Sequence, residues 1–386
     1  MEEKRKYLEY FDGAFDPTVA EKIKPENKPY VAYSRTEGVV YSIVPKEDMF
    51  EVTYLKYVTT NDLKSTQYQV VDLGLPSGTK WLDRNIGAKT VDDYGAYFTW
   101  GNTDGVIFDT VLMTLDQVTE LLVGPNYTEE NKTQVKSDID NGLLNYTHKL
   151  ADYPFGNYDA YNETFGSKLE VVYNDDNTYT VIDSNDGNKV LAQNISGKDL
   201  TQLRIPLTYD IMNRINNSYM MPTREQYMEL VNETDVMNIL HDDNGNEYVV
   251  TLFDNTENGD DETDGYKSSY IVNPELPEGV DIWSLKLDRI IFTNKSDSSK
   301  SISFKANGNC YNFSPNAAIG IPGGNVYKPS TGSVLGYLDS DGYYWSSSLY
   351  DNSNAYQLSF SRDSVDGNIS DNRYIGCGVR GIEFIS

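Results

Sequence analysis

One short stretch near the start of the chain, Val71–Trp81, constrains the fold more than any other part of the sequence. It places Gly74 and Gly78 among apolar residues and a proline. Glycine tolerates the positive backbone dihedral φ that tight turns require, so this spacing predicts short strands separated by sharp turns. Two further glycine- and aromatic-rich segments, Gly342–Ser348 and Gly376–Arg380, lie near the C-terminus. These three anchor segments predict one ligand-binding module that is closed by its own two ends.

Charge and composition limit the partners that such a chain can bind. The 386 residues carry a formal net charge of -27. A phosphate backbone or an anionic membrane surface would be repelled, so we expect no nucleic-acid binding. No apolar run approaches the length of a membrane span, so we expect no membrane insertion either. Tyrosine is abundant, with 31 residues against 13 phenylalanines, which suits binding surfaces and half-buried strands equally well.

The termini and the cysteines give expectations about the compartment. The first residues are charged and contain no apolar core of signal-peptide length, so we expect synthesis in the cytoplasm without an encoded export signal. Only two cysteines, Cys310 and Cys377, are present. This number excludes a disulfide scaffold and predicts two reduced structural thiols.

The pattern along the chain predicts three regions. Residues 1–27 are charged and poor in aliphatic side chains, which predicts an N-terminal arm that orders on a partner or stays loose. Residues 28–67 contain a hairpin pattern and a third alternating run. Three strands make a marginal unit, so we expect this small β-rich attachment region to pack on other elements. Residues 68–386 form the main domain.

Inside the main domain the predicted elements give an α+β, strand-rich fold. Thr114 and Thr223 each begin a capping box, which predicts a short helix after each of them. A third short helix is predicted over 208–215, and residues 126–167 are predicted to be loops. Strands are predicted in a meander over 168–193 and at 248–253, 269–272, 290–293 and 302–305.

The anchor segments carry a resemblance to a known family. The matching stretches are Val71–Trp81, Asn85–Ala88, Asp93–Gly101, Met221–Tyr227, Gly342–Ser348 and Val379–Arg380. Their residues and their order along the chain resemble the family called the Fibrobacter succinogenes major paralogous domain, which is common in gut Bacteroidetes. The resemblance implies a C-type-lectin-like fold over residues 68–386, with insertions at about 103–205 and 232–300.

Four large side chains in these segments have predicted structural roles. Trp81, Trp100 and Trp345 are interpreted as core aromatics, because a sugar-stacking platform would need an exposed ring face. Arg380 lies beside apolar residues near the chain end. We expect it to be a buried, paired arginine that locks the terminal strand.

The sequence offers no recognisable reaction chemistry. The two histidines, His148 and His241, lack the spacing of a metal pair. There is no serine elbow and no phosphate-binding loop. The calcium-binding sugar motifs of C-type lectins are missing, and the surroundings of the two cysteines do not resemble the oxidases of this fold. We therefore predict no catalytic residue, no metal and no cofactor.

The expected binding surface lies between Trp345 and Val379, where tyrosine, asparagine, serine and aspartate dominate as in antibody loops. In lectin-fold relatives diversified by retroelements, this segment is the one that varies. An ordinary hydrophilic hairpin is the alternative interpretation. The predicted ligand-binding residues are Tyr350, Asn352, Asn354, Tyr356, Arg373 and Tyr374.

A second resemblance suggests where such a module would work. The opening Lys28–Tyr33 with Val39–Tyr41 is similar to openings of structural proteins from phages of gut Bacteroidetes. It implies a non-enzymatic virion surface protein: a head fibre, capsid decoration or adhesin made in the host cytoplasm. Residues 1–60 would attach it to a capsid or other virion protein, and the lectin-like domain would bind a host-surface glycan or protein. We expect a homotrimer. A bacterial cell-surface or secreted adhesin and a carbohydrate-active enzyme remain the alternatives.

Overall fold

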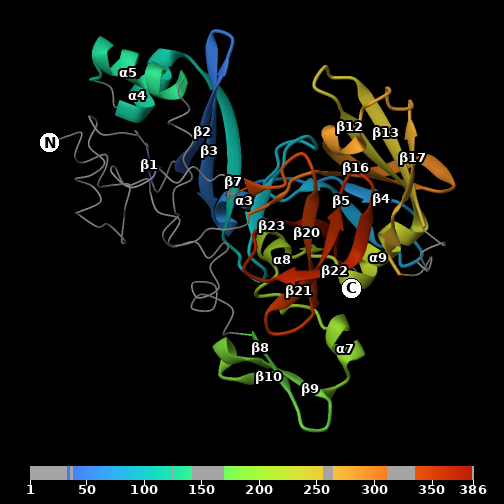
Figure 1. Ribbon diagram of the computed structural model, residues 1–386. Helices are drawn as coiled ribbons and strands as arrows, with labels where there is room; N and C mark the ends of the chain where they lie inside the picture. The colour runs from blue at the N-terminus through green and yellow to red at the C-terminus, as the bar shows by residue number, and fades with distance from the viewer. Residues whose placement is uncertain are drawn as a thin grey trace. The chain divides into compact units, whose positions relative to one another are not determined.

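The chain is a mixed α+β protein, as the sequence predicts, and far more of its described residues lie in strands than in helices (Figure 1). The computed structural model describes residues 33–34, 38–123, 126–140, 169–254, 264–310 and 335–384. The predicted arm, residues 1–27, lies outside these residues. The contacts divide the chain into unit 1, made of residues 1–58, 106–153 and 312–334, and unit 2, made of residues 59–105, 154–311 and 335–386. The predicted boundary at residue 68 falls inside unit 2, and the predicted insertion over 103–205 is shared between the units.

Unit 1 is a small sheet covered by two helices. Its strands lie in the order β1-β2-β3-β7, and β2 and β3 form an antiparallel hairpin that turns at Glu47, whose φ is 53°. The bounds are β1 (Tyr33–Ser34), β2 (Gly38–Lys46), β3 (Met49–Val58), β7 (Gly105–Met113), α4 (Leu115–Val123) and α5 (Glu129–Asp140). The second strand of the predicted hairpin and the third alternating run of residues 28–67 are therefore confirmed as β2 and β3, and they pack on other elements as expected.

Helix α5 corrects the predicted loop over residues 126–167 at residues 129–140, and residues 141–167 lie outside the described part of the chain. Thr128 caps the helix reciprocally with Asn131, because each backbone N–H donates to the side-chain oxygen of the other residue. One turn apart, Val135 and Ile139 are buried against β2 and α4. Two apolar residues are enough to dock the helix, although they form a stripe too sparse to recognise in the sequence.

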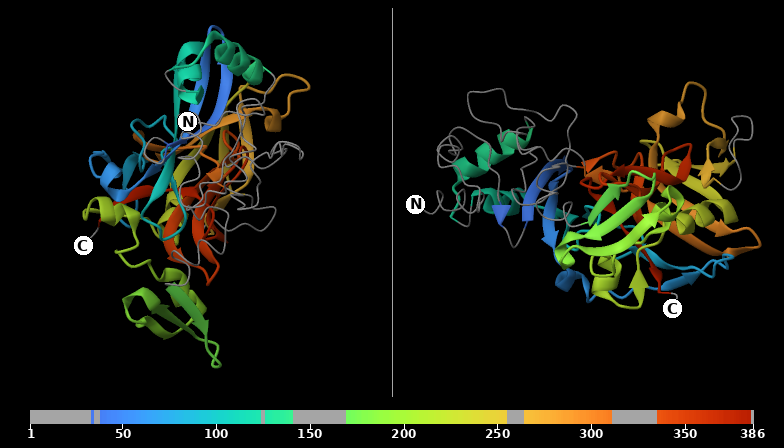
Figure 2. Two further views of the ribbon diagram at one scale, coloured as in Figure 1. Left: turned by 90° about the vertical axis from the view of Figure 1, so that its left-hand side faces the viewer. Right: turned by 90° about the horizontal axis from the view of Figure 1, so that it is seen from below.

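Unit 2 contains five sheets, and Figure 2 shows it from two further directions. The strand orders are β6-β23-β20-β21-β22-β14, β11-β24-β5-β4, β15-β13-β12-β16-β17, β10-β9-β8 and β18-β19. The strand bounds are β4 (Val70–Asp72), β5 (Lys80–Asn85), β6 (Ala96–Phe98), β8 (Leu169–Tyr173), β9 (Tyr179–Asp183), β10 (Lys189–Ile195), β11 (Tyr219–Met220), β12 (Thr234–His241), β13 (Glu247–Phe253), β14 (Tyr266–Lys267), β15 (Ser269–Asn273), β16 (Lys286–Asn294), β17 (Asp297–Lys305), β18 (Asn309–Cys310), β19 (Leu335–Gly336), β20 (Gly342–Leu349), β21 (Asn354–Phe360), β22 (Val365–Asn372), β23 (Cys377–Gly378) and β24 (Arg380–Glu383). The helical segments are α3 (Thr60–Leu63), η2 (Ser184–Asp186), α7 (Gly197–Gln202), α8 (Ile211–Ile215), α9 (Arg224–Glu233) and η4 (Ile282–Ser284). The described part of the chain has no helix with the length and apolar composition that a bilayer crossing requires.

The three anchor segments meet in the core of unit 2. The strands that overlap the first and last of them pair, because β5 runs antiparallel to β24 and places Trp81 opposite Ile382 and Asn85 opposite Arg380. The Arg380 Nε donates to Asn85 Oδ1 at 2.9 Å, and Asn85 Nδ2 donates to the Tyr344 hydroxyl at 2.9 Å. Tyr344 and Arg380, from the second and third anchor segments, thus share one buried polar network with Asn85, which lies four residues after the first. The paired strands β5 and β24 close unit 2 by its two ends, as predicted.

The three tryptophans of the anchor segments are core residues, as the sequence predicts. Trp81, Trp100 and Trp345 are all fully buried. The indoles of Trp100 and Trp345 tie their strands together, because Trp100 Nε1 donates to Ser346 O at 2.8 Å and Trp345 Nε1 donates to Phe98 O at 2.9 Å. The Trp81 ring packs 5.8 Å from the ring of Phe304. Phe304 lies on β17, a strand that begins inside the predicted 232–300 insertion and ends just after it. The five-stranded sheet β12–β17 therefore shares the main core.

The glycine turns predicted from the first anchor segment are present at Gly74 and Gly78, and two further glycines shortly after it also have positive φ. Gly74, Gly78, Gly87 and Gly95 all have φ between 68° and 81°. At Gly95 a side chain is also excluded by space, since a Cβ would lie 2.6 Å from the Ile86 carbonyl oxygen.

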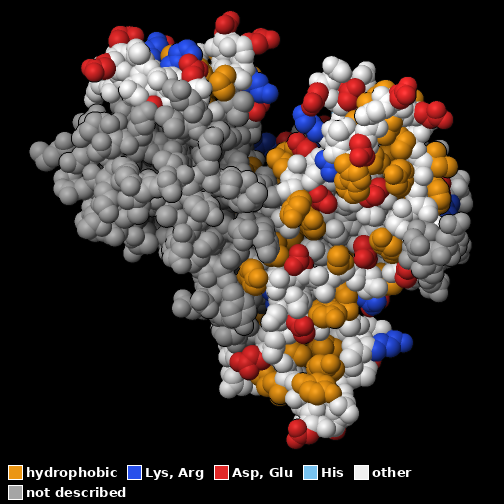
Figure 3. Space-filling view, in the orientation of Figure 1, with side chains coloured by type: hydrophobic (Ala, Val, Ile, Leu, Met, Phe, Trp, Pro, Cys, Tyr) orange, Lys and Arg blue, Asp and Glu red, His pale blue; other side chains and the backbone are white. Residues whose placement is uncertain are grey.

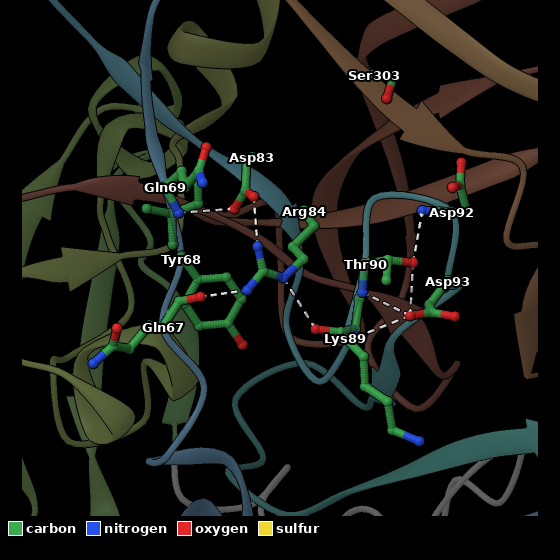
Figure 4. Close-up of polar contacts among 12 residues, drawn as sticks. Gln67, Tyr68, Gln69, Asp83, Arg84, Lys89, Thr90, Asp92, Asp93 and Ser303 are labelled. Carbon is green, nitrogen blue, oxygen red and sulfur yellow. Dashed lines mark hydrogen bonds and ion pairs between the residues drawn. The ribbon is translucent and has the colours of Figure 1, made fainter.

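Polar contacts around Arg84 fix the chain that leads into and out of β5 (Figure 4). The Arg84 guanidinium donates to Asp83, to the Gln67 carbonyl and to the Ala88 carbonyl. It also lies 5.3 Å from the ring centroid of Tyr68. All of these partners belong to the protein itself, so the network supports the fold.

Helix α9 joins the first anchor segment to the rest of unit 2. Its predicted capping box is formed, with Thr223 and Gln226 bonded reciprocally. Further along the helix, Glu229 accepts hydrogen bonds from the backbone and hydroxyl of Ser77 at 2.7 and 2.5 Å. The predicted inward residues Tyr227, Leu230 and Val231 are buried. Two motifs separated by about 150 residues thus hold each other in place.

Candidate binding surface

The connection between β20 and β21 is a turn organised by one aspartate. Asp351 Oδ1 accepts hydrogen bonds from the backbone N–H groups of Ser353 and Asn354, both at 2.7 Å. This is the arrangement in which an aspartate side chain replaces a backbone partner in a turn. The Asn354 amide also donates to the Asp351 carboxylate at 3.1 Å. The turn is therefore held by its own side chains.

Arg373 is a structural residue, which corrects its predicted role in ligand binding. Its side chain is fully buried, and the guanidinium lies 4.8 Å from the ring centroid of Trp100. It donates to the carbonyl oxygens of Asp351, Asn354 and Leu169. A planar guanidinium has five donors in fixed directions, so one arginine can fasten three segments at once. A ligand at the surface would not reach it.

Two of the predicted asparagines also stabilise the turn. The Asn352 Oδ1 accepts a hydrogen bond from the Val171 N–H at 2.5 Å, which ties the turn to strand β8. The Asn354 amide is bonded to Asp351, as described above. Tyr374, the last predicted residue, is partly exposed on the chain between β22 and β23.

The remaining predicted residues, Tyr350 and Tyr356, form an aromatic pair. Their ring centroids lie 5.3 Å apart in an edge-to-face arrangement, a favourable geometry for aromatic rings. Tyr350 is 44% exposed, whereas Tyr356 is 7% exposed. Tyr356 is therefore the buried member of the pair, and Tyr350 is the member whose ring solvent can reach.

The sequence did not reveal the arginine that completes this cluster. Arg224, the first residue of α9, places its guanidinium 5.0 Å from the ring centroid of Tyr356. Its Nε donates to Asn368 Oδ1 at 2.5 Å. The Arg224 backbone N–H donates to Ser348 Oγ at 3.1 Å, so the second anchor segment positions the start of α9. Burial raises the pKa of the Tyr356 phenol, and the charge of Arg224 opposes this shift.

A shallow groove of about 420 Å³ runs beside this cluster, between α7 and α9. It shares Arg224 with the aromatic pair. Carboxylates outnumber ammonium and guanidinium groups along it, and the groove is lined by Lys198, Thr201, Gln202, Arg224, Glu225, Met228, Glu229, Asn232 and Glu233. The arrangement offers a flat ring, a guanidinium, amides and hydroxyls, which together suit recognition of a polar ligand.

Potential catalytic and metal-binding groups were also located. No three histidine, cysteine, aspartate or glutamate side chains gather as a metal site within the described residues. Cys310 and Cys377 are buried and unpaired with each other, and burial raises the pKa of both thiols well above the usual value. His241 lies on β12, opposite Glu247 of β13. His148 lies outside the described residues.

The chain was compared with protein-family models, with curated proteins and with solved structures, and none of the three comparisons gave a match. The inference about function therefore depends on the residues and their geometry.

Proposed function

We propose that the chain is a non-enzymatic phage virion surface protein whose unit 2 is a C-type-lectin-like binding module. The observation that carries the proposal is the cluster of Tyr350, Tyr356 and Arg224 beside a turn that Arg373 and Asp351 hold rigid. Rigid aromatic anchors with polar neighbours bind partners at a low cost in conformational entropy. The pairing of β5 with β24 supports a binding module closed by its two ends, which is what the anchor segments predict.

The proposed ligand is a glycan or protein on the host surface. Tyrosine and arginine are residue types that contribute most of the binding energy at protein interfaces. Tyr350 exposes 44% of its surface, while Tyr356 and Arg224 fix its surroundings. In this proposal the protein acts as a head fibre, decoration or adhesin and assembles as a homotrimer.

The variant Tyr350→Ala tests the binding surface. We expect binding of the purified protein to host cells to weaken at least tenfold, corresponding to about 1.4 kcal/mol, because the accessible ring is lost. Tyr173→Ala is the matched control, because Tyr173 is also an exposed tyrosine of unit 2, 60% exposed, on β8. Binding should be measured by surface plasmon resonance or flow cytometry. Equal binding by wild type and Tyr350→Ala would refute this surface, and turnover of a glycan would refute the non-enzymatic assignment.

The attachment role proposed for residues 1–60 is tested best by a deletion that is shorter than this range. Strands β2 and β3 contribute Ile43, Phe50 and Val52 to the core of unit 1, so removing them would expose Val118 and Val135. Deletion of residues 1–27 leaves all of these strands intact. We expect this deletion to abolish incorporation into particles while host-cell binding persists, and normal incorporation would contradict attachment through the arm.

A further inference from the structure

Trp283 differs from the other three tryptophans of the chain. Trp81, Trp100 and Trp345 are fully buried, whereas Trp283 is 55% exposed. Tryptophan has the largest apolar ring. An exposed tryptophan therefore loses more of the favourable free energy of burial than any other exposed apolar side chain. Such a residue at a solvent-exposed position of unit 2 calls for a ligand.

The backbone on both sides of Trp283 is firmly held. Trp283 lies in the short 3-10 helix η4, between Ile282, which is 4% exposed, and Leu285, which is 1% exposed. Asp281 caps this helix and accepts the Trp283 N–H at 3.1 Å. The hydroxyl of Ser284 donates to the Asp281 carbonyl at 2.6 Å. Buried residues on either side and a closed cap fix the position from which the indole projects.

Arg362 supplies a hydrogen-bonding partner next to the ring. Its guanidinium carbon lies 5.9 Å from the centroid of the Trp283 ring. Its Nε donates to the Leu285 carbonyl at 2.5 Å, so the guanidinium is anchored to the same segment that carries the tryptophan. The other nitrogens of the guanidinium keep their donor capacity. Ring and guanidinium come from segments about 80 residues apart and are joined by a specific contact.

Two carboxylates lie near Arg362. Asp363 follows Arg362 in the β21–β22 turn, where it accepts the Ser361 hydroxyl at 2.9 Å. Asp341 interacts electrostatically with Arg362, and burial raises the pKa of its carboxyl. Asp341 and Asp363 thus place negative charge near the guanidinium, and Asp281 caps the short helix that carries the ring. An anionic ligand would be repelled there, as it would by the net charge of -27.

We propose that Trp283 and Arg362 form a second ligand site, separate from the Tyr350 surface, that binds an uncharged pyranose ring. A pyranose presents an apolar face of C–H groups, which matches an exposed indole, and a rim of hydroxyls, which match guanidinium donors and carboxylate acceptors. The side chain that lies next to the ring, Arg362, is charged, whereas a protein hot spot is enclosed by contacts that exclude water. This chemistry favours a sugar over a protein partner at Trp283.

The full-length protein offers a direct measurement, because Trp283 is the only one of its four tryptophans that solvent reaches. Methyl glycosides of glucose, galactose, mannose and N-acetylglucosamine would be titrated to about 50 mM, above the dissociation constant of a weak millimolar site. We expect at least one to change the tryptophan emission saturably and to protect Trp283 from quenching by acrylamide. Trp283→Phe should bind more weakly, and Trp283→Ala should lose at least about tenfold in affinity by saturation-transfer NMR.

Two further variants separate this site from the Tyr350 surface. Arg362→Gln should weaken binding of the same glycoside about tenfold, because a charged hydrogen bond is lost. Tyr350→Ala should leave it unchanged, so loss of host-cell binding in that variant and loss of sugar binding in Trp283→Ala are independent results. The proposal is overturned if no glycoside protects Trp283, or if Trp283→Ala binds like wild type. Equal affinity for methyl glucuronide would overturn the preference for uncharged sugars.

Discussion

Arg380 shows how a charged residue can be a core residue without a carboxylate partner. It is 1% exposed, and its guanidinium donates to Asn85 Oδ1, to the Leu82 carbonyl and to the Ser303 carbonyl at 2.7 to 3.0 Å. The ring of Phe304 lies 4.3 Å from the guanidinium carbon. Burial lowers the pKa of Arg380 to about 10, so the side chain remains charged at neutral pH. Its partners are neutral acceptors on β5 and β17, which joins the last strand of the chain to both.

We expect Arg380→Lys to lower the free energy of unfolding by about 2–4 kcal/mol. Lysine keeps the charge but lacks the planar fork, so it leaves buried carbonyl oxygens without donors. The control on the same strand pair is Lys80→Ala, which removes the exposed ion pair of Lys80 with Glu383 at 3.4 Å. That change should cost less than about 1 kcal/mol. Urea unfolding of both variants gives the comparison. Equal losses in the free energy of unfolding would show that the directed hydrogen bonds of Arg380 stabilise the fold no more than an exposed ion pair does.

Among the secondary-structure elements, the sequence predicted those whose signals are local. The helices α4 and α9 were predicted because a capping box needs only four consecutive residues. Strand β12 was missed because it follows α9 without a turn and its inward face includes Asn238. That buried amide donates to the carbonyl oxygens of Ser361 and Arg362 at 2.7 and 3.0 Å, a contact across more than 120 residues.

The same distinction explains how much of the binding surfaces could be predicted. Tyr350 and Tyr356 lie six residues apart and were proposed together from composition. Arg224 joins them from the start of α9, and Trp283 meets Arg362 from another segment. A single sequence does not show which distant residues meet in the fold. Arg373 was misassigned for the same reason, since its carbonyl partners lie in the turn between β20 and β21 and on β8, which is about 200 residues away in the sequence.

Helix α8 carries a titratable cap. Asp210 is 1% exposed and accepts hydrogen bonds from the backbone N–H groups of Met212, Asn213 and Met221. Burial is the main influence and raises its pKa to about 6, although the N–H donors and Arg204 oppose the shift. Between the unfolded value of 3.8 and the folded value, the folded state holds a proton that the unfolded state has lost. The contribution of Asp210 to stability is therefore largest in acid and decreases as pH rises to about 6.

The stability of Asp210→Asn should consequently increase relative to that of the wild type as pH increases. Asparagine is also a good helix cap and does not titrate, so any constant cost of the substitution is independent of pH. We expect the difference in the free energy of unfolding to move in favour of the variant by about 2–3 kcal/mol between pH 4 and pH 7. Urea titrations of the two proteins across this range measure the difference. Parallel stability curves would mean that the pKa of Asp210 is not raised.

At the scale of the whole molecule, each unit has a hydrophobic core of its own. Ile43, Phe50 and Val118 belong to the core of unit 1, whereas Trp81 and Phe304 belong to that of unit 2. Because each unit has its own core, we predict that each unfolds in a cooperative transition of its own. This division would let the proposed attachment and binding functions tolerate mutation independently.

Substitutions in the two cores test this independence with probes that the sequence itself provides. All four tryptophans lie in segments of unit 2, so tryptophan fluorescence follows that unit, whereas far-ultraviolet circular dichroism follows both. Phe304→Ala removes a fully buried ring from unit 2. It should lower the free energy of unfolding that tryptophan fluorescence reports by about 3–5 kcal/mol. Phe50→Ala, at a position 7% exposed in unit 1, should shift only part of the dichroism signal and leave the fluorescence midpoint in place. If Phe50→Ala moves the fluorescence midpoint as far as the dichroism midpoint, the two cores unfold as one cooperative structure.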